Sequence, residues 1–118
     1  MKVFERDGKI NFVDEKNVFV GFDYQACCCE QFGYFFSKTE PLTEDVKGEK
    51  DFDPEGYCFD KEFYKTQDAG EAGAEAIFRL THPSKPEIFL TLFNHHNGYY
   101  AHGFTMTVDG ENLRSASL

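Results

Sequence analysis

Residues 75–108 read EAIFRLTHPSKPEIFLTLFNHHNGYYAHGFTMTV, and this stretch decides the fold. Three segments in it are rich in β-branched and aromatic residues, a composition that favours strands, and they span residues 75–82, 87–96 and 99–108. Between the second and third segments lies Asn97-Gly98, a dipeptide preferred in two-residue type I′ hairpin loops. The pattern therefore predicts an antiparallel meander in which Phe93 pairs with His102.

One face of this meander is the expected core face. Alternation of side chains places two sets of residues on it, namely Phe89, Thr91, Phe93 and His95 from one strand and Tyr100, His102, Phe104 and Met106 from the next. We expect a helix from elsewhere in the chain to cover this face, because an apolar sheet face must be buried against another layer.

The first third of the chain also carries strand patterns. Met1–Glu5 and Lys9–Val13 flank Asp7-Gly8, which favours a tight hairpin because both central residues of a type I′ turn need positive φ. Residues 18–22 are apolar on both faces, as expected for a covered central strand. Residues 34–37 predict a returning strand.

A short helix is expected from Tyr24 to Phe32. Asp23 is a suitable N-cap, and Gly33 is a suitable stop. Tyr24, Cys28 and Phe32 recur at helical spacing on one face. The predicted fold class is therefore α+β: a mainly antiparallel sheet of about five to seven strands with a C-terminal meander, one short helix packed on it and a long acidic loop.

The acidity of the chain is concentrated in its middle third. The 118 residues carry 12 Lys and Arg against 21 Asp and Glu, a net charge of −9. Residues 39–75 hold 12 of the acidic and 4 of the basic residues and contain several Gly and Pro, so we interpret them as an acidic, loop-rich insert. The length fits one domain, placed at residues 1–108, with residues 109–118 as a loose tail.

Charge and hydropathy argue against several classes of protein. The negative charge argues against binding a nucleic-acid backbone, which needs clustered Lys and Arg. No run of about 18 apolar residues predicts a membrane span, and the first residues lack the apolar segment of a signal peptide. We therefore expect a soluble cytoplasmic protein, whose oligomeric state these features leave open.

The consecutive cysteines Cys27-Cys28-Cys29 are the most unusual local feature. Neighbouring helical residues point about 100° apart, so three thiols in a row cannot face one ion. The C-x-x-C spacing of common zinc sites is also absent. We interpret Cys28 as a buried core residue beside Tyr24 and Phe32.

A zinc site is an alternative interpretation. In the predicted register His95 and His102 form a diagonal pair on one sheet face, close enough to share an ion. Cys28, Cys29 or Cys58 would supply the remaining ligands. A catalytic Cys/His pair is a third interpretation, because such pairs form in space and leave no fixed sequence spacing.

The segment around the cysteines resembles part of a known kind of protein. It combines Val20-Gly21-Phe22-Asp23-Tyr24, Cys27-Cys28-Cys29-Glu30 and Gly33-Tyr34. This pattern is similar to a segment found in small bacterial and phage-type proteins that have no assigned function. The resemblance implies a single-domain prokaryotic or viral protein, and it implies no catalytic residues.

Residues 51–62 match the spacing of a calcium-binding loop, with Gly56 at the sixth position and Glu62 at the twelfth. Neither flank supplies an amphipathic helix long enough for a helix–loop–helix unit. A solvated acidic turn is therefore the favoured interpretation, and no cofactor is assigned.

The functional expectation is a non-enzymatic binding or accessory protein. The sequence contains no G-x-S-x-G, G-x-G-x-x-G or G-x-x-x-x-G-K-[ST] motif, so we assign no catalytic residue. We expect the acidic insert to contact a basic protein partner through Asp51, Asp53 and Glu55. In a variant of this hypothesis, the carboxylates imitate nucleic-acid phosphates on such a partner.

Overall fold

The computed structural model describes residues 1–24, 32–40, 52–68, 74–94 and 102–118, and this part of the chain is all-β. The strands within it are β1 (Lys2–Arg6), β2 (Lys9–Val13), β3 (Val18–Asp23), β4 (Phe32–Ser37), β5 (Cys58–Asp68), β6 (Ala74–Thr81), β7 (Ile88–Asn94), β8 (Gly103–Val108) and β9 (Glu111–Ser117).

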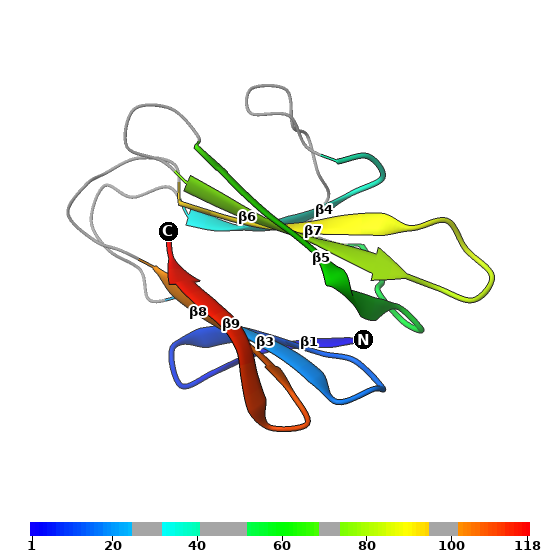
Figure 1. The fold of residues 1–118 in the computed structure, drawn as a ribbon, viewed down its shortest axis with the longest axis horizontal. Coiled ribbons are helices and arrows are strands. Elements are labelled where there is room, and N and C mark those ends of the chain that lie inside the picture. Colours follow the sequence, from blue (N-terminus) through cyan, green and yellow to red (C-terminus); the bar gives the residue numbers. More distant parts are fainter. Residues whose placement is uncertain (25–31, 41–51, 69–73, 95–101) are drawn as a thin grey trace.

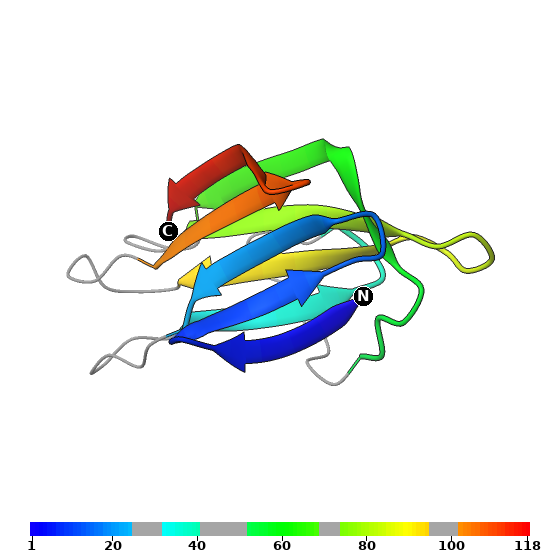
Figure 2. The same ribbon diagram turned by 90° about the horizontal axis from the view of Figure 1, so that it is seen from below.

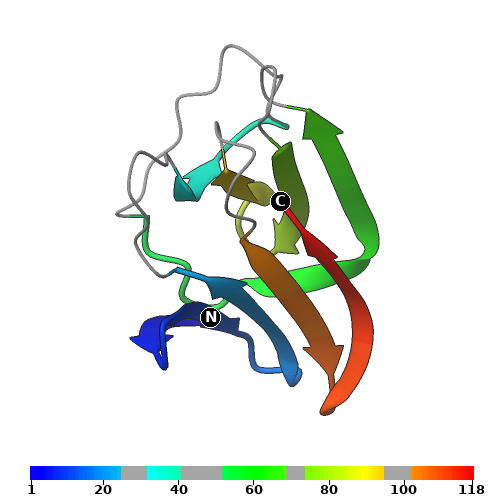
Figure 3. The same ribbon diagram turned by 90° about the vertical axis from the view of Figure 1, so that its left-hand side faces the viewer.

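These strands form two antiparallel sheets packed face to face as a β-sandwich (Figure 1). The first sheet has five strands in the order β1-β2-β3-β8-β9, and the second has four in the order β4-β7-β6-β5. The chain therefore leaves the five-stranded sheet after β3 and returns to it at β8. Figure 2 shows the five-stranded sheet in front of its partner, and Figure 3 shows the two layers from one end.

Two of the three hairpins of the five-stranded sheet turn at Asp-Gly dipeptides. Asp7 and Gly8 have φ of 55° and 75°, which confirms the predicted tight turn between β1 and β2. Asp109 and Gly110 repeat this geometry with φ of 52° and 83° between β8 and β9. Residues 109–118 were expected to be a loose tail, but most of them form β9, which pairs with β8 along its length.

The predicted α+β class is wrong, because the described residues contain no helix. Phe32, expected at the end of the helix, is instead the first residue of β4 and pairs with Asn94. Its ring centroid lies 5.4 Å from that of Tyr24. Residues 25–31, which make up the rest of the predicted helix, lie outside the described residues.

The pairing of β6 with β7 agrees with the predicted meander, but the pairing of Phe93 with His102 is wrong. Phe93 pairs with Gly33 of β4 and Glu75 of β6, while β8 lies in the other sheet. Burial explains the difference. The ring of Phe104 on β8 packs edge-on against Phe78 at 5.5 Å, a contact across two layers that a single-layered meander does not provide.

The core lies between the sheets. Its fully or nearly fully buried members include Phe12, Val20, Phe22, Phe78, Leu80, Leu90, Leu92, Phe104 and Met106. On β7 the inward side chains are therefore Leu90 and Leu92, and the expected core face through Phe89 and Thr91 is the outer one. Phe89 and Thr91 are also buried. Both faces of β7 are covered, so alternation of apolar residues could not distinguish them.

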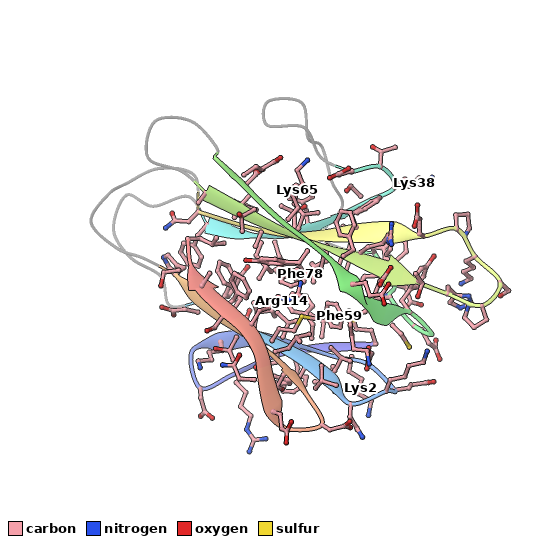
Figure 4. The ribbon with its side chains drawn as sticks, viewed as in Figure 1. Lys2, Lys38, Phe59, Lys65, Phe78 and Arg114 are labelled. Carbon is pink, nitrogen blue, oxygen red and sulfur yellow. The ribbon has the colours of Figure 1, made fainter. Side chains whose placement is uncertain are left out.

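The acidic insert is only partly loop, because β5 forms an edge of the four-stranded sheet. β5 pairs with β6 and shifts register between Phe59 and Tyr64. Figure 4 shows Phe59 and Phe78 between the two sheets, together with Arg114 of β9. Within the described ranges, no helix is long and apolar enough to cross a membrane.

Candidate functional site

An open hollow lies beside the turn between β2 and β3, and its lining is rich in carboxylates. Its volume is about 610 Å³, and it is lined by Met1, Lys2, Val13, Asp14, Glu15, Asn17, Asp53, Glu55 and Gly56. We call it the acidic hollow. It brings Asp53 and Glu55, two of the predicted interaction residues, together with Glu15 from a distant part of the chain. Asp51, the third, lies outside the described residues.

Asp14 fixes the wall of the acidic hollow. Its side chain is buried, with 6% of its surface exposed. One carboxylate oxygen accepts hydrogen bonds from the backbone N–H groups of Lys16 and Val18, at 2.9 and 3.0 Å, and the other accepts one from Phe59 at 2.9 Å. Asp14 therefore ties the β2–β3 turn, which carries Glu15, to the start of β5.

The opposite wall is a hydrogen-bonded turn over residues 53–56. The carboxylate of Asp53 accepts the backbone N–H of Glu55 at 3.1 Å, and Gly56 has a positive φ of 81°. The carbonyl of Pro54 accepts the backbone N–H of Tyr57 and the amino group of Met1. These bonds hold Glu55 at the rim of the hollow, where it is exposed to solvent.

The electrostatic character of the hollow follows from its lining. Four carboxylates and two amino groups line it, and the carboxylate of Asp14 is already occupied by three N–H donors. Glu15, Asp53 and Glu55 are exposed and present the remaining negative charge to solvent. The three exposed carboxylates outnumber the two amino groups, on Met1 and Lys2, so the lining is negative on balance and favours a positively charged group.

Within the described ranges, no group of three or more His, Cys, Asp or Glu side chains is placed to hold a metal ion. The calcium-loop spacing does not correspond to one loop, because Glu62 lies inside β5. There its backbone N–H donates to Asp60 at 3.0 Å.

The predicted zinc ligands that the structure describes do not come together. Cys58 pairs with Thr81 at one end of β6, whereas Ala74 at the other end pairs with Asn94. His102 lies near Asn94, because both residues donate to the carbonyl of Leu118. At about 3.3 Å per residue, these ends of β6 are about 23 Å apart, so Cys58 and His102 cannot share an ion. Cys28, Cys29 and His95 lie outside the described residues, and a zinc site that uses them stays a prediction.

His102 is a packed residue of the sandwich end. It is 1% exposed, and its ring stacks on Phe32 with centroids 4.1 Å apart and planes at 18°. Its Nδ1 lies 3.0 Å from the carbonyl oxygen of Asp23. A carbonyl oxygen can only accept a hydrogen bond, so Nδ1 of His102 must be the donor. His102, which directly precedes β8, therefore contacts both β3 and β4.

A second surface lies on the outer face of the five-stranded sheet, which faces the viewer in Figure 2. One residue from each strand forms a row across it, namely Phe4, Asn11, Gly21, Thr105 and Ser115. Three adjoining depressions of about 390, 420 and 430 Å³ hollow this face. Phe19 lies between two of them, and Lys9 lies between one of these and the third. The three depressions are therefore neighbours, and we call them together the sheet trough.

Glycine forms part of the floor of the sheet trough. A Cβ added at Gly21 would lie 3.1 Å from Cε1 of Phe19 and 3.3 Å from Oδ1 of Asn11. The ring of Phe19 therefore leans over Gly21, and any larger residue there must displace it. Sequence reasoning missed this surface, because the row exists only once the pairing of β3 with β8 is known.

An ion-pair cluster lies on the outer side of β5 and β6. Arg79 donates from Nε to Asp60 at 2.9 Å, approaches Glu87 at 3.5 Å, and stacks over the ring of Phe63 at 4.9 Å. The hydrogen bond from Arg79 lowers the pKa of Asp60, against the opposing effect of burial. These contacts occupy the charged groups with one another and fit a structural role.

Comparison with known proteins leaves the function open. No protein-family model matches the chain, and no curated protein and no solved structure matches it either.

Proposed function

We propose that this protein is a small non-enzymatic binding protein that recognises a basic protein partner through the acidic hollow. The observation that supports the proposal is the convergence of Glu15 with Asp53 and Glu55 at one open hollow. These residues come from two separate segments, and Asp14 holds the segments together through buried hydrogen bonds. A rigid, negatively charged recess suits a Lys or Arg side chain on the surface of a partner.

Binding through the acidic hollow should depend on salt and on where the negative charges lie. Exposed charges interact over about 8–10 Å at physiological ionic strength, so association through the acidic hollow should weaken as salt rises. Negative charge elsewhere on the chain should contribute less than the carboxylates at the hollow. The relevant comparison is therefore between variants of equal net charge.

Two double variants provide this comparison. Glu15→Gln with Glu55→Gln neutralises the acidic hollow, and Glu5→Gln with Glu111→Gln neutralises two exposed residues of the five-stranded sheet. Asp53 is retained, because its carboxylate holds the turn. Binding of a fluorescent oligolysine peptide would be measured by anisotropy over a range of salt concentrations.

The hollow variant should weaken binding severalfold more than the control variant. Amide shifts in NMR spectra should also centre on residues 15–17 and 55–56. Equal weakening by the two variants would mean that the peptide responds only to net charge, and the acidic hollow would then have no recognition role.

A further inference from the structure

The sheet trough points to a second ligand, of a different chemistry from the basic partner. The trough and the acidic hollow share only Val13 and Asn17 among their lining residues. The inference therefore rests on a different surface and does not depend on the proposed function.

The central row of the trough carries no charged side chain, although the chain as a whole has a net charge of −9. It offers the hydroxyls of Thr105 and Ser115 as hydrogen-bonding groups. Thr107 and Ser117 extend these hydroxyls along β8 and β9. A ligand that lies on this row must be satisfied by neutral donors and acceptors.

Aromatic rings stand beside this neutral floor. Phe4 at the β1 edge is 39% exposed, so its ring is accessible to a ligand. Phe19, in the middle of the sheet, leans over Gly21 and separates two of the depressions. The trough thus alternates flat apolar surfaces with hydroxyl and amide groups.

The side chain of Asn11, in the floor of the trough, is fixed by hydrogen bonds. It is only 5% exposed although it lies on the outer face. Its side-chain NH₂ donates to the carbonyls of Phe4 and Lys9, at 3.3 Å each. These bonds fix the amide, whose Oδ1 lies 3.3 Å from the position that a Cβ at Gly21 would take.

We propose that the sheet trough binds a neutral oligosaccharide. A pyranose has an apolar C–H face that stacks on an aromatic ring, and a rim of hydroxyls that exchange hydrogen bonds with Ser and Thr. The adjoining depressions provide room for several consecutive sugar rings. The lining also carries Arg6 and Lys9 beside Asp7, Asp23 and Asp109, so the trough has no excess of positive charge that would attract a polyanionic ligand.

A second copy of the chain is the competing occupant. Stable interfaces between protein chains have an apolar core with few polar groups. The middle of the sheet trough instead carries glycine, hydroxyls and an amide. Its composition therefore favours a hydroxyl-rich ligand over a protein surface.

The test uses the full chain on a printed array of neutral, sialylated and sulfated oligosaccharides, followed by titration of the best neutral binder by calorimetry. Phe4→Ala and Phe19→Ala should each weaken binding about tenfold, through loss of one stacking contact. Gly21→Ala should also weaken it, since the new methyl group displaces Phe19. Leu113→Ala is the control, because Leu113 is 44% exposed on the same sheet and lines none of the depressions.

A second measurement uses the native protein, so it tests the proposal even if the variants do not fold. Chemical shifts of the native protein with the sugar should change at Gly21, Thr105 and Ser115, and the acidic-hollow double variant should bind it unchanged. Failure of every neutral oligosaccharide to bind at millimolar concentration would overturn the proposal. A dimer in sedimentation analysis that Phe4→Ala dissociates would overturn it as well, by assigning the face to a second copy.

Discussion

The guanidinium of Arg114 on β9 lies over the ring of Tyr64 on β5, with Cζ 4.7 Å from the ring centroid. Nη2 of the same side chain donates to the carbonyl of Lys61 at 3.0 Å. β9 and β5 are edge strands of different sheets, so this one side chain fastens the two layers along one side of the sandwich. Burial raises the pKa of Tyr64, and the positive charge of Arg114 acts in the opposite direction.

Arg114→Ala should lower the free energy of unfolding by about 1 kcal/mol, the usual range for a cation–π contact with one hydrogen bond. Urea denaturation would measure the change. Arg6→Ala is the matched control, because Arg6 is 77% exposed and its closest carboxylate, on Asp7, is 4.0 Å away. Equal losses for the two variants would show that Arg114 does not fasten the sheets.

Asp14→Ala should be among the most destabilising substitutions of a single polar residue. It leaves the N–H groups of Lys16, Val18 and Phe59 without their acceptor, and we expect a loss of about 3 kcal/mol or more. Asp14→Asn retains one carbonyl oxygen and should lose about half as much. Thermal unfolding would rank the three proteins, and an unchanged midpoint for Asp14→Ala would contradict the tethering role.

Asp60 should contribute to stability in a pH-dependent way. Its folded-state pKa is lowered by Arg79, so its contribution is present above the unfolded pKa of about 3.9 and disappears as pH falls through the lower folded value. Asp60→Asn should therefore unfold at a lower urea concentration than the parent at pH 7. The difference should shrink towards pH 2, and a constant difference across this range would exclude the linkage.

Gly110→Ala should destabilise the protein, whereas Gly103→Ala should not. Gly110 has φ of 83° with no atom within 4 Å of an added Cβ, so its cost comes from the backbone alone and should be about 1 kcal/mol. An added Cβ at Gly103 meets only ordinary contacts at 3.7 and 3.9 Å. Gly103→Ala should therefore be neutral or stabilising by up to about 1 kcal/mol. Calorimetry would measure the melting temperatures of both variants, and a melting temperature for Gly103→Ala as low as that for Gly110→Ala would contradict the prediction.

The sequence predicted some of the local pairings. The hairpin at Asp7-Gly8, the central strand over β3 and the pairing of β6 with β7 all follow from turn dipeptides and alternation over a few residues. Asp109-Gly110 carries the same signal as Asp7-Gly8. The polar composition of β9 does not favour a strand, so the sequence does not predict the second hairpin.

The long-range arrangement could not be predicted in this way. β8 was expected beside β7 because the two are neighbours in sequence, yet it pairs with β3. That choice depends on which layer buries Phe104 and Met106, a property of the whole sandwich. Neither candidate surface could therefore be predicted from neighbouring residues. The acidic hollow combines the β2–β3 turn with the segment before β5, and the sheet trough crosses the β3–β8 pair.

The pairing of β3 with β8 has a consequence for synthesis of the chain. Val18 pairs with Val108, and the whole four-stranded sheet is encoded between them. During synthesis, the edge of β3 that will pair with β8 therefore stays without hydrogen-bond partners until β8 has been made. The apolar side chains of β3 also stay uncovered, and strands in this condition are prone to aggregate. Chains stalled before β8 should bind a hydrophobic dye and a holdase chaperone, whereas released full-length chains should bind neither. Equal binding by both would show that β3 is already protected before β8 is made.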